Sequence, residues 1–134
     1  MRFRVRPGRF ALLSIPRPRL VVALDALARL DLGGFGQVIA EPEGLTLLVP
    51  ETRLRRAAKA AGTCRLERGF RVITFTPAMD WAVVGFLARV TGALARARVP
   101  VGVVCGFDLD HLFVRDRYLS RARAALRAAL RGGS

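Results

Sequence analysis

The side chains best suited to nucleophilic or metal chemistry are few and far apart. Cys64 and Cys105 form no CxxC pair, and the single histidine, His111, has no serine or second cysteine at a motif spacing. Each cysteine stands beside apolar or small residues, where a free thiol usually packs as a small hydrophobe. We therefore predict no catalytic residue, no metal site and no cofactor, and a structural role for the histidine.

Two carboxylates offer another kind of chemistry. Asp108 and Asp110 stand two residues apart in a turn-like segment, residues 106–110. Such a pair could hold a hard cation, although cation sites usually draw oxygen atoms from more residues. Hydrogen bonds from turn amides to the two side chains explain the pattern equally well. The spacing alone leaves both interpretations open.

The composition predicts a small folded protein with a sizeable core. The chain has 134 residues, 52% of them hydrophobic, and a mean hydropathy of +0.31, which excludes wholesale disorder. Its apolar stretches, such as residues 99–105, fall well short of the roughly 20 residues that cross a bilayer. The apolar piece at residues 11–15 is shorter than the roughly 7 to 15 residues of a secretory signal. We expect a cytoplasmic protein with no membrane partner.

Charge is the most unusual feature of the composition. Lys and Arg number 23 against 10 Asp and Glu, which gives a net charge of +13 and a pI near 11.8. Such a balance suits a nucleic-acid partner. However, Lys59 is the single lysine, the arginines are spread from Arg2 to Arg131, and the basic run at residues 53–59 has no interleaved aromatics. Biased composition explains this pattern too, so nucleic-acid binding is kept as the alternative and is not favoured.

Hydrophobic periodicity organises the second half of the chain. Residues 70–75 are rich in β-branched and aromatic types and predict a strand. A helical pattern then runs from Asp80, a suitable N-cap, to Arg98. Its apolar stripe consists of Val83, Leu87, Val90, Leu94 and Ala97. The single tryptophan, Trp81, stands just inside the expected helix start, where an aromatic residue usually joins the core.

Two short strands and a terminal helix follow. Residues 101–105 and 111–114 flank the turn at residues 106–110, which predicts a hairpin. From Asp116 onward the sequence is amphipathic and predicts a helix. The apolar face of this helix consists of Leu119, Ala122, Leu126 and Leu130.

The first half repeats this order in weaker form. The expected elements are a strand at residues 10–15, a helix at 20–30, a hairpin of strands at 35–40 and 45–49, and a helical piece at 51–62. The apolar side of the helix at 20–30 would be Leu20, Leu24, Leu27 and Ala28. Two halves of similar order, residues 1–64 and 65–134, indicate an internal duplication. Helices that alternate with hairpins indicate an α+β fold of the split βαβ type.

Three segments in this order resemble the ACT-domain family. They are FGQVIAEPEGLTLLVPE at residues 35–51, the stretch 70–87 with PAMDWAVVGFL, and the stretch 94–119 with VPVGVVCGFDLDHLFVRDRYL. The chain is similar to small bacterial proteins with two ACT-like halves, to the regulatory domains of aspartate kinases and to the cytosolic arginine sensors of animals. The resemblance implies two tandem ferredoxin-like βαββαβ units, of which the first is divergent or incomplete. It also implies a regulatory module that binds an amino acid or similar effector where ACT units meet, and no enzyme activity.

The resemblance further implies where the effector binds. Backbone amides at the start of the helix after Asp80 would bind a carboxylate, and Asp108, in preference to Asp110, would accept an ammonium group. The full set of expected site residues is Asp80, Trp81, Val83, Val84, Gly85, Cys105, Gly106, Phe107, Asp108 and Asp110.

Departures from the family narrow the choice of ligand. Ala82, Val83 and Val84 at the helix start, and Cys105 and Gly106 before the acidic turn, stand where the family tends to have small hydroxyl residues. Several side-chain hydrogen bonds are then missing, which favours an apolar amino acid. The competing hypothesis is a module that has lost its ligand and serves dimerisation or protein interaction only. Since the effector site of this family lies where ACT units meet, the resemblance implies a homodimer or an intramolecular pair of the two halves, and we expect the homodimer.

Overall fold

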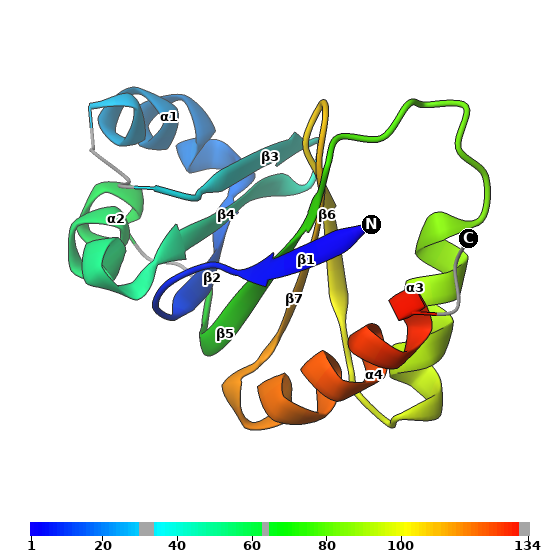
Figure 1. The fold of residues 1–134 in the computed structure, drawn as a ribbon. Coiled ribbons are helices and arrows are strands. Elements are labelled where there is room, and N and C mark those ends of the chain that lie inside the picture. The colour runs from blue at the N-terminus through cyan, green and yellow to red at the C-terminus, as the bar shows by residue number, and fades with distance from the viewer. Residues whose placement is uncertain (30–33, 63–64, 132–134) are drawn as a thin grey trace. The chain divides into compact units, whose positions relative to one another are not determined.

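The computed structural model describes residues 1–29, 34–62 and 65–131 (Figure 1). In chain order its helices and strands are β1 (Arg2–Val5), β2 (Phe10–Pro16), η1 (Arg17–Arg19), α1 (Leu20–Ala28), β3 (Gln37–Glu41), β4 (Gly44–Pro50), η2 (Glu51–Arg53), α2 (Leu54–Ala61), β5 (Arg65–Thr76), α3 (Phe86–Arg96), β6 (Gly102–Cys105), β7 (Asp110–Arg115), η3 (Asp116–Tyr118) and α4 (Leu119–Arg131). The expectations for Leu30 and Cys64, and for the side chain of Leu27, concern residues outside this description. Among the described residues, no helix is long and apolar enough to cross a membrane.

The chain forms two compact units. The N-terminal unit contains residues 8–69, and the C-terminal unit contains residues 1–7 and 70–134. Strand β5 therefore contributes residues 65–69 to the first unit and residues 70–76 to the second. We expected a division after residue 64; in the structure the first seven residues group with the C-terminal half.

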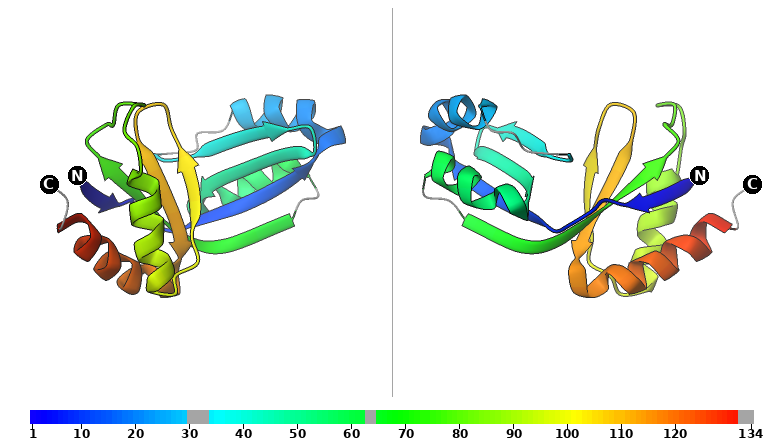
Figure 2. Two further views of the ribbon diagram at one scale, coloured as in Figure 1. Left: turned by 90° about the vertical axis from the view of Figure 1, so that its right-hand side faces the viewer. Right: turned by 60° about the vertical axis from the view of Figure 1, so that its left-hand side comes forward.

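In the N-terminal unit the elements follow the order β2-α1-β3-β4-α2-β5, and the strands lie in the order β3-β4-β2-β5. Strand β4 pairs antiparallel with both β2 and β3. Leu45, Leu47 and Val49, at every second position of the strand, pack in one core with α1 and α2. Both helices cover the same face of the sheet (Figures 1 and 2). This is a full βαββαβ unit, and its last strand is the beginning of β5, beyond residue 64.

The C-terminal unit obtains its fourth strand from the start of the chain. The order β5-α3-β6-β7-α4 gives three strands and two helices, and β1 pairs antiparallel with β5 to complete a sheet in the order β1-β5-β7-β6. We expected no strand before residue 10, so β1 is an addition. Its sequence, RFRV, alternates charged and apolar residues, and Phe3 and Val5 pack against the core while Arg2 and Arg4 are exposed.

The ferredoxin-like α+β class expected from the sequence is confirmed in both units. The expected hairpins are present as β3–β4 and β6–β7. The core of the C-terminal unit lies between the sheet and helices α3 and α4, which share one face of that sheet (Figure 2). Its central side chains are Ile73, Phe75, Val90, Leu94, Leu112, Val114, Ala122 and Leu126.

The predicted face of α1 is wrong in part. Leu20 packs against the core as predicted, but Leu24 and Ala28 are exposed, and Ala23, which was not predicted, is buried. Because apolar residues occupy nearly every position of LVVALDALA, periodicity does not define which side meets the sheet. The predicted face of α4 is right: Ala122 and Leu126 are buried there, and the other two predicted residues pack beside them.

Candidate ligand site

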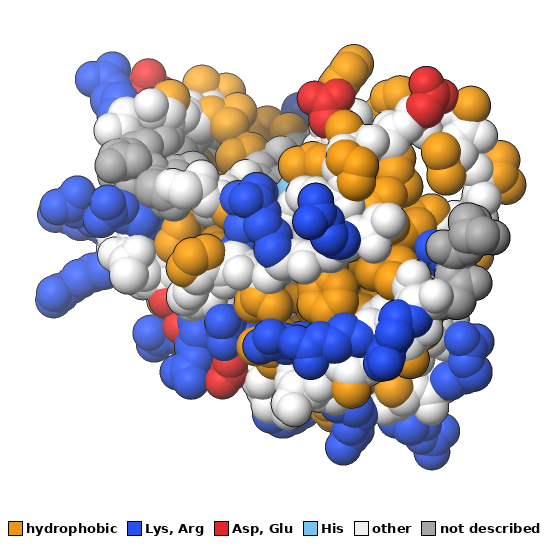
Figure 3. All heavy atoms as spheres, viewed as in Figure 1, with side chains coloured by type: hydrophobic (Ala, Val, Ile, Leu, Met, Phe, Trp, Pro, Cys, Tyr) orange, Lys and Arg blue, Asp and Glu red, His pale blue; other side chains and the backbone are white. Residues whose placement is uncertain are grey.

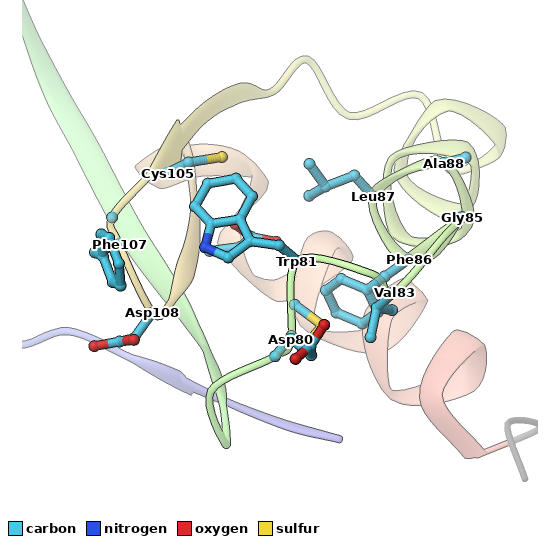
Figure 4. Close-up of a pocket in the computed structure, with 13 residues that line it drawn as sticks. Asp80, Trp81, Val83, Gly85, Phe86, Leu87, Ala88, Cys105, Phe107 and Asp108 are labelled. Atoms are coloured by element: carbon cyan, nitrogen blue, oxygen red, sulfur yellow. The ribbon is translucent and has the colours of Figure 1, made fainter.

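A pocket of about 330 Å³ lies within the C-terminal unit, where the loop before α3 approaches the β6–β7 turn (Figure 4). This volume falls at the lower end of the range of small-molecule sites. The lining residues are Met79, Asp80, Trp81, Val83, Gly85, Phe86, Leu87, Ala88, Cys105, Gly106, Phe107, Asp108 and Asp110. The structure thus brings together all the expected site residues except Val84, which is 95% exposed and does not line the pocket.

The helix before this pocket starts later than predicted. Asp80 is not its N-cap, because its carboxylate accepts a hydrogen bond from the amide of Ala82 at 2.7 Å within a tight turn. The carbonyl of Asp80 also accepts the amide of Val83 at 3.1 Å. Gly85 then adopts a left-handed conformation, with φ of 87°. A helix cannot continue through that conformation, so α3 begins at Phe86.

The amides of Ala82 and Val83 are therefore used within this turn, and the amides that α3 presents at its start are further along the chain. The first amide bonded inside α3 is that of Arg89, which donates to the carbonyl of Gly85 at 3.0 Å. The amides of Phe86, Leu87 and Ala88 come before it and have no acceptor in the preceding turn of helix. All three residues line the pocket, at the positive end of the helix dipole.

The hairpin turn forms the opposite wall. It is closed by a hydrogen bond from the Gly106 amide to the Leu109 carbonyl at 2.9 Å. A side chain at position 106 would place its Cβ 3.3 Å from that carbonyl, which explains the glycine. The carbonyl of Asp108 accepts a hydrogen bond from the Met79 amide at 3.4 Å, and this contact joins the two walls.

Of the two carboxylates in the turn, Asp110 is the one held within the site. It is half-buried and pairs across the hairpin with Cys105. Partial burial, together with a hydrogen bond to the negatively charged Asp110, raises the pKa of the Cys105 thiol. The Cys105 sulfur points toward Trp81, whereas the exposed Asp108 carboxylate points away from α3 (Figure 4). Cys105 is exposed, so its thiol lines the pocket as expected and does not pack in the core.

Two aromatic side chains form the outer rim. Trp81 is 77% exposed and Phe107 is 83% exposed, and their rings meet edge to face with centroids 6.4 Å apart. The expectation that Trp81 joins the core is wrong, because the turn after Asp80 replaces the predicted helix and directs the indole to the pocket mouth. Val83 is also exposed beside this rim.

A buried polar group lies on β7, beside the pocket residue Asp110. His111 Nδ1 is 2.9 Å from Thr74 Oγ1, which also accepts a hydrogen bond from Arg6 Nε at 2.9 Å. Burial, followed by the positive charge of Arg6, lowers the pKa of His111, and the charge of Asp110 opposes this effect. The burial of His111 and its contact with Thr74 fit the structural role predicted for it. Thr74, its hydrogen-bond partner, and Arg6, which bonds to Thr74, come from distant parts of the chain, and no sequence signal links them to the histidine.

The sequence missed four pocket residues: Met79, Phe86, Leu87 and Ala88. Three of them form the first turn of α3, and they were missed because the helix start was placed at Asp80. The one signal that could have located the true start is Gly85, since a glycine inside an apparent helix often marks an irregular backbone position.

The N-terminal unit is a βαββαβ sandwich, and the C-terminal unit has the same layers with β1 in the place of the last strand. Comparison with known proteins identifies this fold more closely. A family model described as the ACT domain matches residues 65–128. The resemblance to the ACT domain noted from the sequence is thereby confirmed over these residues. No curated protein matches the sequence.

Solved structures share the tandem fold over nearly the whole chain. The aspartokinase alpha and beta subunits superimpose with a TM-score of 0.80 at 12% identity, over 98% of each chain. The ligand-free regulatory subunit of aspartate kinase from Thermus thermophilus gives 0.71 at 14% identity, over 98% of this chain and 97% of that one. A protein of Agrobacterium tumefaciens gives 0.72 at 21% identity, over 95% and 87% of the two chains. At these identities the likeness establishes the fold.

Proposed function

We propose that this protein is a non-catalytic regulatory module that binds a free amino acid in the pocket between α3 and the β6–β7 turn. One observation carries the proposal: the residues of the first turn of α3, Phe86, Leu87 and Ala88, line the same pocket as the acidic residue Asp110. The match to the ACT domain and the likeness to regulatory subunits of aspartate kinase support a regulatory role.

The two ends of an amino acid require opposite partners. A carboxylate is stabilised by the amides of Phe86, Leu87 and Ala88 and by the positive end of the helix dipole. An ammonium group is stabilised by the half-buried Asp110 through a charge-assisted hydrogen bond. Asp108 is the weaker candidate, because its exposed carboxylate points away from α3 and competes with water.

The ligand's side chain meets mainly apolar surface. Met79, Leu87 and the Trp81 indole line the pocket, and none of them offers a charge to a polar ligand. We therefore propose an apolar amino acid as the effector, bound chiefly through its ammonium and carboxylate groups. We further propose that the protein is a cytoplasmic homodimer and that effector binding regulates a partner protein.

A thermal-shift screen against the twenty amino acids tests this function. A ligand that binds the native state raises the melting temperature by mass action, and we expect apolar amino acids to give the largest rise. Asp110→Asn should abolish the rise, Asp108→Asn should reduce it only slightly, and Glu43→Gln should leave it unchanged. The last variant removes the same charge from an exposed turn of the other unit.

Two outcomes contradict the proposal. If no amino acid raises the melting temperature at millimolar concentration, the module that serves dimerisation or protein interaction only is the better account. If the rise survives in Asp110→Asn and disappears in Glu43→Gln, the ligand binds elsewhere.

A further inference from the structure

A second concave surface of the C-terminal unit lies apart from the pocket, between the edge strand β1 and helix α4. It is an open groove of about 770 Å³. The described residues that line it are Met1, Arg2, Phe3, Arg4, Val5, Arg123, Arg127, Leu130 and Arg131. None of them lines the amino-acid pocket. We call this surface the β1–α4 groove.

Charge and apolar surface are arranged in parallel rows along this groove. Figure 3 shows basic side chains over β1 and over α4, with hydrophobic side chains exposed between the two rows. Five of the lining residues are arginines, and none of the described ones is acidic. The floor is formed by Phe3, Val5 and Leu130, which are half-buried and pack on the core. The groove therefore favours an occupant that is both anionic and partly apolar.

The backbone of β1 faces this groove with unused hydrogen-bonding groups. Among the described strands, β1 pairs with β5 alone, so it is an edge of its sheet. The Arg6 amide donates to the Val72 carbonyl at 2.8 Å. Bonded pairs alternate along an antiparallel ladder, so the amides and carbonyls of Arg2 and Arg4 point toward β5. Those of Phe3 and Val5 point to the open edge, where an added strand can bond them.

We propose that the β1–α4 groove binds an extended acidic segment of a partner protein, which adds to β1 as a further strand. Its backbone bonds to Phe3 and Val5, and its alternate apolar side chains lie on the floor that these residues form with Leu130. Its acidic side chains point to the opposite face, where they meet Arg2 and Arg4, and the nearby positive charge of the α4 arginines attracts the segment as a whole. The β1 edge of a second copy of this chain is disfavoured as the occupant, because two arginine-lined grooves would repel each other. A nucleic acid is also disfavoured, since the one aromatic ring in the groove, Phe3, is half-buried and gives bases little surface for stacking.

Fluorescence anisotropy with a labelled peptide that alternates glutamate and valine tests this proposal on the full-length protein. We expect binding that weakens as salt is added. Two further peptides carry backbone N-methyl groups on all the glutamates or on all the valines, which removes hydrogen-bond donors without changing the charge. One of the two should lose affinity about tenfold or more, because its methyl groups meet β1, and the other should bind nearly as well as the parent.

Charge reversal of arginines in the groove provides a second test of the proposal. Arg123→Glu with Arg127→Glu changes two exposed side chains of α4 and should weaken peptide binding by at least about tenfold. The matched control is Arg55→Glu with Arg56→Glu, which makes the same change on exposed positions of α2 and should alter affinity less than about twofold. Circular dichroism verifies that both variants fold.

Three results would overturn the proposal. The first is equal binding of both N-methylated peptides, which excludes strand addition. The second is an equal loss in the control variant, which indicates non-specific attraction to a basic protein. The third is tighter binding of an oligothymidylate of equal charge, lost on reversal of Arg123 and Arg127, which identifies the groove as a nucleic-acid site.

Discussion

Trp81 and Phe107 meet edge to face across the mouth of the pocket, with an angle of 76° between their ring planes. One ring comes from the loop before α3 and the other from the β6–β7 turn. Both rings are largely exposed, so their position follows from this mutual contact and from the backbone of the two loops. The contact links the two walls that the proposed ligand touches.

A double-mutant cycle measures this link. Edge-to-face pairs contribute roughly 0.5 to 1.5 kcal/mol, and exposure places this pair at the lower end. We expect Trp81→Ala and Phe107→Ala to show a coupling energy of about 0.5 kcal/mol in urea unfolding. A cycle between Phe107 and Val84 serves as the control, because Val84 lies outside the pocket, and it should show no coupling. Coupling that is equal in the two cycles would contradict an edge-to-face contact.

Gly85 and Gly92 should respond in opposite ways to alanine. Gly85 has φ of 87°, and an added Cβ would meet no neighbouring atom, so Gly85→Ala should cost about 1 kcal/mol through backbone strain alone. Gly92 lies inside α3, and its Cβ would touch only the end of Arg96 at 3.4 Å. Gly92→Ala should therefore stabilise the protein by up to about 1 kcal/mol. Urea unfolding measures the stability of both variants. A stabilising effect of Gly85→Ala would contradict the left-handed backbone conformation of Gly85 before α3.

His111 should make stability depend on pH in a defined window. Burial, and then Arg6, lower the pKa of this residue in the folded protein from 6.5. Just below pH 6.5, His111 therefore binds a proton in the unfolded chain but not in the folded protein. The contribution of this residue makes the free energy of unfolding fall as the pH decreases through this range. Above pH 6.5 its contribution is constant.

Urea unfolding at a series of pH values tests this effect. In His111→Gln the decline just below pH 6.5 should be largely absent, although the variant is less stable at neutral pH because the hydrogen bond between Thr74 and His111 is lost. An unchanged decline in the variant would assign the pH dependence to other groups.

The Cys105 thiol should be slow to alkylate, because its raised pKa keeps it protonated at neutral pH. Asp110→Asn removes a negative charge and a hydrogen-bond acceptor from its surroundings and should accelerate the reaction with iodoacetamide. Asp108→Asn should not. Mass spectrometry resolves the modification of Cys105 from that of Cys64, and an unchanged rate in Asp110→Asn would exclude the proposed contact.

Most of the fold follows from the sequence because the elements are short and strongly patterned. The β6–β7 hairpin is marked by VGVVC, a turn rich in glycine and aspartate, and HLFV, and α4 is marked by leucines at helical spacing. The sequence patterns of strand β1 and of the start of β5 are weaker. RFRV alternates over four residues only, and RLERG contains one apolar residue, so long-range pairing rather than local preference makes them strands.

The site was predictable in its location and not in its detail. Two loops that flank adjacent elements of a βαββ unit must approach each other, which brings residues 80–85 near residues 105–110. The start of α3 depends instead on whether the Asp80 carboxylate caps a helix or accepts a hydrogen bond within a separate turn. The local sequence is compatible with either arrangement. The ranking of Asp110 above Asp108 depends on side-chain direction, which spacing does not encode.

The central claim is that the pocket recognises both the ammonium and the carboxylate group of an amino acid. Isothermal titration with the best apolar amino acid from the screen, its amide and its N-acetyl derivative tests this claim directly, because the amide lacks the carboxylate and the acetyl group removes the ammonium. We predict that both derivatives bind at least about tenfold more weakly than the parent, and that Asp110→Asn removes the preference for the parent over the N-acetyl derivative. Equal binding of all three compounds would contradict the account.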